Sequence, residues 1–313
     1  MKALVIGGAG FIGSHLCDAL LEEGNEVICF DNFSLGKRDN ISHLSNNESF
    51  RLYEKDASIE AELEEVFEKE MPDYVFHLAA NSDIQASASN PEVEYKNTYT
   101  TTFQILSAMR KHNVKKLFFA STSAVYGDKR DVKLDENTPN LAPISYYGAA
   151  KLGSEALISA FSYMNDIDVL VFRFPNVIGP RLTHGVIYDF MNRLKADPEN
   201  LRILGDGNQT KPYVYVLDLV EAIMKFKDTV FEGIKLYNVG VESATSVTKI
   251  ADIVCEEMGL KNVKYTYTGG EGGWKGDVPK FSYCIDKIHN AGWHAKFTSD
   301  EAVRETVKKN IGR

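Results

Sequence analysis

Residues 2–31 decide the fold, and they read KALVIGGAGFIGSHLCDALLEEGNEVICFD. The apolar run Ala3–Ile6 predicts a strand, and Phe11–Glu23 predicts a helix that ends at Gly24-Asn25. Glu26–Phe30 predicts the next strand. A strand, a glycine-rich turn, a helix and a second strand in this order are typical of a βαβ unit with parallel strands.

The turn carries glycines at three spaced positions, Gly7, Gly10 and Gly13. Gly7 permits a tight turn, Gly10 lets the backbone approach a pyrophosphate, and Gly13 allows close packing of helix on strand. The N-terminus of the following helix offers N–H donors and the positive end of its dipole. The sequence therefore predicts a dinucleotide site, although the spacing is G-x-x-G-x-x-G rather than G-x-G-x-x-G. The alternative is a structural loop that binds nothing.

Asp31 closes the second predicted strand and favours NAD as the cofactor. A carboxylate at this place accepts hydrogen bonds from the ribose hydroxyls and repels the 2′-phosphate of NADP. Lys37 and Arg38 lie nearby and weaken this preference, since cations attract that phosphate.

Strands and helices alternate through the first half of the chain, which predicts a parallel sheet. Further strands are expected at Arg51–Glu54, Tyr74–Leu78, Lys116–Ala120 and Val169–Phe172, and helices at Ile59–Glu70 and roughly Glu92–His112. After Phe174, glycines and prolines interrupt the pattern. We expect an α/β fold, a doubly wound parallel sheet with a smaller mixed α/β C-terminal lobe. The cofactor domain is placed at residues 1–176 with a return near 216–241, and a discontinuous substrate lobe at 177–313.

The composition narrows the class of protein. The 313 residues hold 35 Lys and Arg against 44 Asp and Glu, and a net charge of −9 argues against a nucleic-acid surface along the chain. Four cysteines without a C-x-x-C pair predict reduced, mostly buried thiols, as in a cytoplasmic protein. No signal peptide and no apolar run of membrane-spanning length are visible. No cluster of His, Cys and acids predicts a metal site.

A second motif lies far downstream, where Tyr147 and Lys151 stand four residues apart on one expected helix face. Ser121-Thr122-Ser123 ends a predicted strand, and ligands bind outside the carboxyl ends of strands in such sheets. A phenol pKa of about 10 is too high for a base at neutral pH. We expect Lys151 and a positively charged nicotinamide to lower it, so that Tyr147 exchanges a proton while the nicotinamide exchanges a hydride. The alternative is a partly buried tyrosine above an exposed lysine.

The order and spacing of these motifs resemble the extended short-chain dehydrogenase/reductase family, and within it the nucleotide-sugar epimerases. The resemblance covers nearly the whole chain. Its further marks are Asp31-Asn32, Asp56-Ala57, His77-Leu78-Ala79-Ala80, Asn97, Ser121–Gly127, Arg173–Arg181, Gly205–Tyr215 and Gly276-Asp277.

The resemblance implies a Rossmann-like cofactor domain, bound NAD and a set of site residues. The implied catalytic residues are Thr122, Tyr147 and Lys151. The implied cofactor contacts are Gly7, Gly10, Phe11, Ile12, Gly13, Asp31, Asn32, Asp56, Ala57, Leu78, Ala79, Ala80, Asn97, Tyr147, Lys151 and Phe174. The implied substrate contacts are Ser82, Thr122, Asn176, Val186, Lys211 and Phe281, the last beside the C2 substituent of the sugar.

The activity that the resemblance implies is 4-epimerisation of a UDP-hexose, with UDP-glucose and UDP-galactose expected. Tyr147 would remove the C4 hydroxyl proton, the C4 hydride would go to NAD⁺, and after the keto sugar turns over the hydride would return to its other face. The resemblance also implies a homodimer, with the helix that begins at Tyr146-Tyr147 against a partner subunit.

Departures from the family pattern limit this reading. Ser123 and Ala124 stand where dehydratases carry an Asp-Glu pair and decarboxylases a Glu, which disfavours both reactions. Lys211 replaces the usual Arg, and Trp274-Lys275 stands where another Arg is expected, so the base and the sugar stay open. The remaining alternatives are an epimerase of a UDP-N-acetyl sugar or UDP-uronate, a 4-ketosugar reductase, and a non-catalytic NAD-binding protein.

Overall fold

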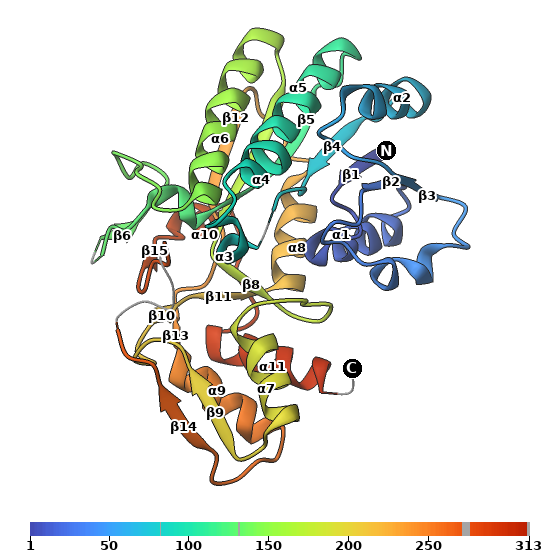
Figure 1. Ribbon diagram of the computed structural model, residues 1–313. Helices are drawn as coiled ribbons and strands as arrows, with labels where there is room; N and C mark the ends of the chain where they lie inside the picture. Colours follow the sequence, from blue (N-terminus) through green and yellow to red (C-terminus); the bar gives the residue numbers. More distant parts are fainter. Residues whose placement is uncertain (82, 131, 271–275, 312–313) are drawn as a thin grey trace. The chain divides into compact units, whose positions relative to one another are not determined.

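The computed structural model describes residues 1–81, 83–130, 132–270 and 276–311 and divides the chain into two compact units (Figure 1). Unit 1 comprises Met1–Val125, Tyr146–Arg173 and Val220–Tyr237. Unit 2 comprises Tyr126–Ser145, Phe174–Leu219 and Asn238–Arg313. In the described ranges, no helix combines the length and apolar character that a membrane span requires.

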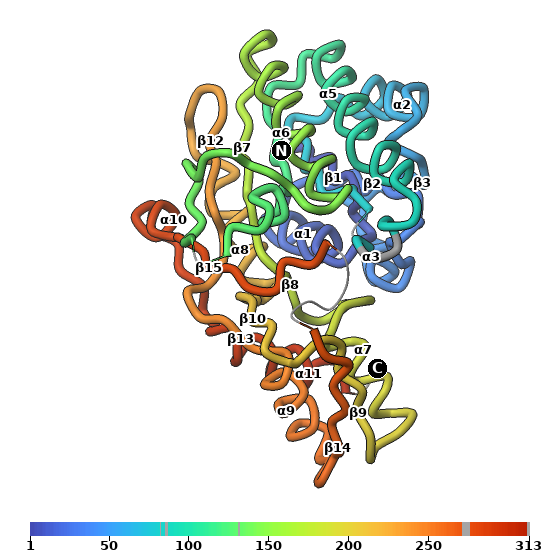
Figure 2. The backbone as a smooth tube through the Cα atoms, turned by 60° about the vertical axis from the view of Figure 1, so that its left-hand side comes forward, coloured from blue at the N-terminus to red at the C-terminus, as the bar shows by residue number. Residues whose placement is uncertain are grey.

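Unit 1 is built on a seven-stranded sheet, as the α/β prediction requires. The strands in spatial order are β12 (Ile234–Asn238), β7 (Asp168–Phe174), β5 (Lys116–Thr122), β4 (Tyr74–His77), β1 (Lys2–Ile6), β2 (Glu26–Asp31) and β3 (Phe50–Glu54). The pairings of β1 with β2 and β4, of β2 with β3 and of β4 with β5 are parallel. Figure 2 shows the late strand β12 beside β7. The strand order reverses at β1, and in open α/β sheets ligands bind in the crevice that forms at such a reversal.

Helices cover both faces of this sheet because its strands are apolar on both sides. Along β2, Ile28 and Phe30 belong to the core cluster formed with α2 (Glu60–Glu70), α5 (Thr101–Lys111) and α6 (Tyr146–Asn165). Cys29, between them, faces Cys17 of α1 (Phe11–Glu22) on the other side. The second helix of that side is α8 (Val216–Phe226), whose Phe226 contacts Phe172 of β7.

The predicted helix at Glu92–His112 is divided. It consists of α4 (Glu92–Glu94), a π-helical segment η3 (Tyr95–Thr100) and α5. A π-helical turn takes one more residue than an α-helical turn and shifts the register of the residues on either side, and such turns occur frequently at functional sites. The remaining short helices of unit 1 are η1 (Arg38–Asn40), η2 (Ser42–Leu44), α3 (Ile84–Ser87) and η4 (Ser123–Tyr126), the last extending by one residue into unit 2.

Unit 2 is a mixed α/β body with its own core. The apolar faces of α7 (Val186–Ala196), α9 (Val247–Glu257) and α11 (Ser299–Asn310) form this core with the strands. The strand pairs are β8 (Asn176–Ile178) with β11 (Tyr213–Tyr215), β9 (Asn200–Ile203) with β14 (Lys264–Tyr267), β10 (Thr210–Lys211) with β13 (Thr245–Ser246), and β6 (Lys133–Leu134) with β15 (Ser282–Tyr283). Helix α10 (Asp286–Asn290) completes the unit. Thr298 and Glu301 form a capping box that begins α11.

The unit boundaries differ from the predicted domains by a few residues at several places and by one longer segment. Tyr126–Ser145 was expected in the first domain, but the structure places it in unit 2. The cause is long-range pairing: β6 pairs with β15, and the Asn238 side chain accepts a hydrogen bond from Tyr126 Oη at 2.7 Å and donates one to Leu134 O at 3.0 Å. The expected return near 216–241 is Val220–Tyr237.

Candidate active site

The glycine-rich turn between β1 and α1 allows contacts that no other residue would permit. Gly7 has φ +86°, and a Cβ there would lie 2.7 Å from Ala79 N. A Cβ at Gly13 would lie 2.1 Å from Gly7 O, so the first turn of α1 can pack on the loop only with glycine. Gly10 is the N-cap of α1 and makes no side-chain capping bond. The half-buried Phe11 and Ile12 then begin the helix.

Asp31 lies at the carboxyl end of β2 and contacts the same turn. Its carboxylate accepts hydrogen bonds from Ala9 N at 2.9 Å and from Phe33 N at 2.8 Å. Burial raises the pKa of Asp31, and these backbone donors oppose that rise. Asp31 therefore holds the glycine-rich turn in place through these two backbone donors. Asn32, beside it, is exposed.

The other predicted cofactor contacts of unit 1 lie around this edge. Leu78 N and Ala79 N both donate to Ile6 O at 2.9 Å, which places the half-buried Leu78–Ala80 beside the end of β1. Asp56 is half-buried and accepts hydrogen bonds from Ser58 and Lys96, and Ala57 is buried.

Two further predicted contacts lie on other elements. Asn97 is half-buried in η3, where Thr98 is buried, and Glu94 at the end of α4 is also buried. Phe174 belongs to unit 2. Ser82, a predicted substrate contact, lies outside the described residues, as do Trp274 and Lys275.

Thr122, Tyr147 and Lys151 are brought together at the end of β5. Thr122 is the last residue of that strand, and its hydroxyl is hydrogen-bonded to the phenol of the half-buried Tyr147. Lys151 is 1% exposed. Its Nζ donates to Ala120 O at 2.8 Å and lies 4.6 Å from the centre of the Phe119 ring. The first two turns of α6 thus rest directly on β5.

The electrostatics of this trio differ from the sequence-based expectation. Burial raises the pKa of Tyr147, the charge of Glu94 raises it further, and the hydrogen bond from Thr122 opposes both. Burial lowers the pKa of Lys151 to about 7, against the charges of Glu94 and Glu155. The expected lowering of the Tyr147 pKa by Lys151 is not found in the protein by itself. Burial disfavours the charged form of both groups, the phenolate of Tyr147 and the ammonium of Lys151.

Sequence reasoning missed the polar groups that support the trio. Ser121 Oγ donates to Glu155, and Arg173 donates to the two oxygens of the same carboxylate at 3.0 and 2.6 Å. This network ties the C-terminal parts of β5 and β7 to the middle of α6. The i, i+4 spacing of Lys151 and Glu155 could have indicated that the two side chains are neighbours on one helix face. The partner Arg173 comes from a distant strand, so no local pattern pointed to it.

The predicted substrate residues of unit 2 lie on separate elements. Asn176 begins β8 and is exposed, and the half-buried Val186 begins α7. The Lys211 ammonium, predicted to bind phosphate, is hydrogen-bonded to the Asp277 carboxylate. Phe281 is buried, with its ring centre 5.6 Å from that of Tyr283, which is the position of a packing residue.

Comparisons with known proteins find similar epimerases, and also a dehydratase and a decarboxylase. The model of the NAD dependent epimerase/dehydratase family matches residues 3–240. An uncharacterized UDP-glucose epimerase of Bacillus subtilis is 34% identical over 83% of each chain. A UDP-glucuronate 4-epimerase of Thermodesulfobacterium geofontis is 30% identical over 98% of this chain and 96% of that protein.

Solved structures give the same result. UDP-glucose 4-epimerase of Thermotoga maritima, solved with UDP-glucose, superposes with a TM-score of 0.89 at 33% identity over 99% of this chain and 98% of that one. UDP-glucose 4-epimerase of Thermus thermophilus, solved with NAD, gives 0.88 at 30% identity with the same coverage. UDP-N-acetylglucosamine 4-epimerase of Methanobrevibacter ruminantium, in complex with UDP-N-acetylmuramic acid, gives 0.88 at 29% identity, again with the same coverage.

Proposed function

The chain belongs to the NAD dependent epimerase/dehydratase family, and from this premise we propose that it is a 4-epimerase of UDP-glucose and UDP-galactose. One observation carries the proposal: the Tyr147 phenol is hydrogen-bonded to Thr122 beside the buried Lys151. A proton acceptor then stands next to a hydroxyl that can orient a sugar hydroxyl. Ser123 and Ala124, which follow Thr122, are not acids, so loss of water or of CO₂ lacks the groups that it needs.

The residues of unit 1 fit NAD. Side chains at Gly7 and Gly13 would clash with backbone atoms. The two glycines therefore let the loop pack tightly, and they leave its backbone uncovered where a pyrophosphate would lie. Asp31 at the end of β2 fits the ribose of NAD and disfavours the phosphate of NADP. When bound, NAD supplies a hydride acceptor for C4 of the sugar and returns that hydride.

The chain's own residues handle the proton. In the proposed reaction Tyr147 takes the proton from the C4 hydroxyl oxygen and later gives it back, while Thr122 holds that hydroxyl in line. Lys151 favours the phenolate when it is an ammonium ion. Burial lowers the pKa of Lys151 to about 7, so the ammonium form is less favoured in the protein by itself than in water.

The choice of a hexose over other sugars rests on unit 2. A uronate would need a cation for its carboxylate, and the Lys211 ammonium is already bonded to Asp277. Relatives named for UDP-glucuronate and UDP-N-acetylglucosamine make those sugars the competing substrates. Incubation with UDP-galactose should give UDP-glucose without net consumption of NAD or NADH. A 4-ketosugar reductase would instead consume one reduced cofactor per product.

We expect the purified chain to retain NAD tightly, because an epimerase regenerates its cofactor in every turnover. Denatured protein, assayed for released nucleotide, should yield NAD. Asp31→Ala should raise the share of NADP among the bound nucleotide, because the variant loses the charge that repels the 2′-phosphate. Release of NADP by the wild type, or an unchanged preference in Asp31→Ala, would contradict the role given to Asp31.

We expect Phe281 to set a preference for UDP-glucose and UDP-galactose over their N-acetyl forms. An acetamido group against an aromatic wall means overpacking, which costs about 1–3 kcal/mol. That corresponds to roughly ten- to hundredfold in kcat/KM. The measurement compares both sugar pairs in the wild type and in Phe281→Ser. Because the ring packs on Tyr283, equal use of both pairs by the wild type would leave Phe281 a packing residue only.

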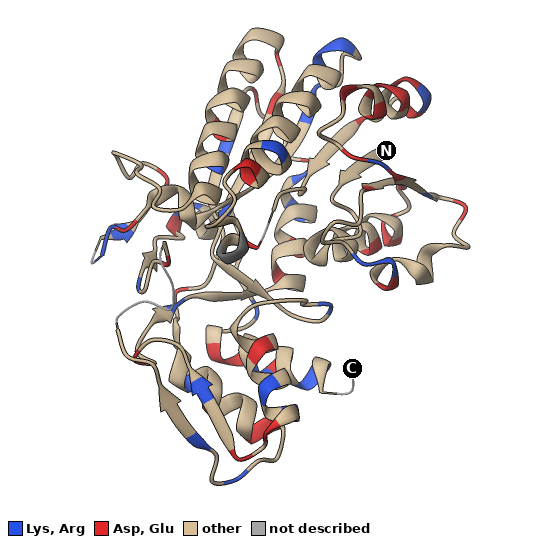
Figure 3. Cartoon of the chain, viewed as in Figure 1, with Lys and Arg blue, Asp and Glu red and all other residues tan. Residues whose placement is uncertain are grey.

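We also propose a homodimer that forms through α5 and α6 and works in the cytoplasm. Figure 3 shows that α6 and most of α5 carry few charged residues. Several large apolar side chains on these helices and on η3 are exposed, namely Tyr95, Phe103, Tyr146, Tyr163 and Met164. An exposed apolar face of this kind is typical of a subunit interface. All four cysteines are free, as suits a reducing compartment. Sedimentation equilibrium would test the subunit number.

A further inference from the structure

Glu94 is a buried carboxylate that the reaction described above does not use. Its side chain lies at the end of α4 and is 1% exposed. Asn81 Nδ2 donates to Oε1 at 2.8 Å, and Thr98 Oγ1 donates to Oε2 at 2.8 Å. Hydrogen bonds from such donors favour the charged form of a carboxylate. Glu94 therefore brings a carboxylate, hydrogen-bonded at both oxygens, into the interior of unit 1.

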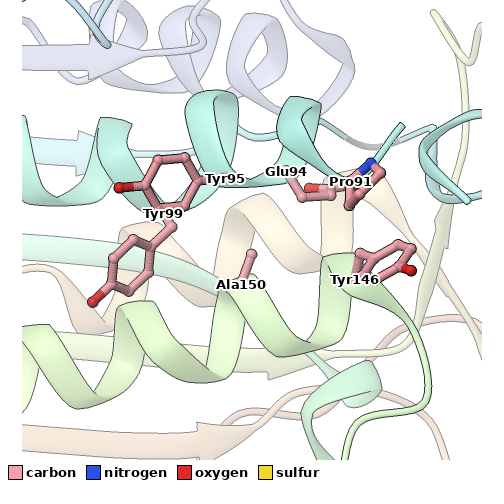
Figure 4. A pocket seen from close by; sticks show the side chains of 6 residues that line it. All are labelled: Pro91, Glu94, Tyr95, Tyr99, Tyr146 and Ala150. Carbon is pink, nitrogen blue, oxygen red and sulfur yellow. The ribbon is translucent and has the colours of Figure 1, made fainter. Parts of the chain in front are cut away.

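This carboxylate faces the N-terminal turns of α6. Glu94 lines a cavity of about 310 Å³ together with Pro91, Tyr95, Tyr99, Tyr146 and Ala150. Figure 4 shows Glu94 on one side of this cavity and Tyr146 and Ala150 of α6 on the other. Tyr146 and Ala150 directly precede Tyr147 and Lys151. Burial is the largest cause of the raised pKa of Tyr147, and the charge of Glu94 is the next. For Lys151, burial lowers the pKa and the charge of Glu94 opposes that change.

The other charges around the pair leave Glu94 without a local counter-ion among the described residues. On α6, Glu155 also acts on Lys151, but Arg173 of β7 neutralises it through a 2.6 Å contact. On β4, burial holds the pKa of His77 well below its usual value, so that ring is neutral. In η3, Lys96 pairs with Asp56. Ile84 and Ser87 of α3 carry no charge.

We infer that Glu94 is a positioning residue for the proposed reaction, whose buried charge sets the pH at which Tyr147 and Lys151 together release a proton. The inference rests on the catalytic role proposed for that pair. When Tyr147 or Lys151 releases one proton, the combined charge of Glu94, Tyr147 and Lys151 changes from zero to −1. The negative charge of Glu94 opposes every such release, whichever of the two groups gives up the proton. Without that charge, each release occurs at a lower pH.

The first test is the pH profile of kcat in Glu94→Gln. Both limbs of the profile should move to lower pH by about one unit, the usual size for one nearby charge. Glu92→Gln is the matched control, since it removes an exposed charge from the same helix and should leave the profile in place. Glu94→Asp keeps the charge and should also keep the profile, even where the shorter side chain lowers the rate. A purely structural role would change the height of the profile and not its position.

The second test needs no turnover. Lysine labelled with ¹³C at Cε is titrated by NMR in the purified chain, and the signal of Lys151 is assigned by its loss in Lys151→Met. The midpoint of Lys151 should fall in Glu94→Gln relative to the wild type and to Glu92→Gln. If Glu94→Gln does not fold, Glu94→Met removes the charge at similar length. Absence of UDP-hexose turnover in the wild type would defeat the proposed function alone. An unmoved midpoint in the uncharged variant would overturn the inference about Glu94.

Discussion

Replacement of Tyr147 by phenylalanine is expected to lower kcat by about 10²–10⁴-fold, the usual contribution of a positioned acid–base group. The variant loses only the hydroxyl that is bonded to Thr122, and the ring keeps its packing. Substrate binding should therefore change little, which steady-state kinetics can show as a nearly constant KM. Isothermal titration with a UDP-hexose would measure the binding directly.

Tyr146→Phe is the matched control for this variant. Tyr146 stands on the same helical turn, but its side chain is 52% exposed. Loss of its hydroxyl should leave kcat within about twofold, since an exposed phenol contributes no proton transfer. A Tyr147→Phe enzyme with near-normal kcat would remove the proton-transfer role and most of the proposed reaction.

Replacement of Lys151 by methionine is expected to abolish most turnover and to change how stability depends on pH. The folded protein lowers the pKa of Lys151 to about 7 from an ordinary value of 10.5. Between these two pH values the unfolded chain binds the proton and the folded chain does not. Unfolding of the wild type therefore becomes harder as pH rises through this window, by about 1.4 kcal/mol per unit. Lys151→Met lacks this slope.

Urea unfolding at pH 7 and pH 9, at equal NAD occupancy, measures the difference. The unfolding free energy of the wild type should rise by about 2–3 kcal/mol relative to Lys151→Met across these two units. Lys116→Met, at the exposed start of the same strand β5, should show no such relative change. Parallel pH dependences of the wild type and Lys151→Met would mean that Lys151 stays charged in the folded protein.

The parts of the site that the sequence predicts are those with a local cause. Gly7 and Gly13 follow from the backbone turn that joins a strand to a helix, and their close contacts confirm the reason for glycine there. Asp31 follows from its place at the end of a buried strand. Tyr147 and Lys151 share a helix face, so their meeting needs only helical spacing. The seven-stranded sheet follows in the same way from apolar runs that are buried on both sides.

The parts that the sequence did not predict depend on partners far away in the chain. Glu94 is recognisable as a site residue only once Asn81 and α6 are placed around it. Strands β6 and β15 hold two residues each, which is too short for an alternation of apolar and polar residues to be recognised. They form because they pair with each other. Thr266 and Tyr267 lie in β14, which likewise pairs with a distant strand, β9. The contact of Phe281 with Tyr283 likewise had no pattern that distinguished it from a ligand contact.

The order of synthesis has a consequence that follows from edge strand β12. This strand pairs with β7, and its Tyr237 packs on Phe172, although Phe174–Leu219 of the other unit is made between the two strands. A nascent chain emerges N-terminus first, so the edge of β7 stays unpaired until Ile234–Asn238 has left the ribosome. An unpaired edge is a template for aggregation during that interval. Unit 1 therefore cannot complete its sheet until most of the chain has been made, and unit 2 must still wait for Asn238–Arg313.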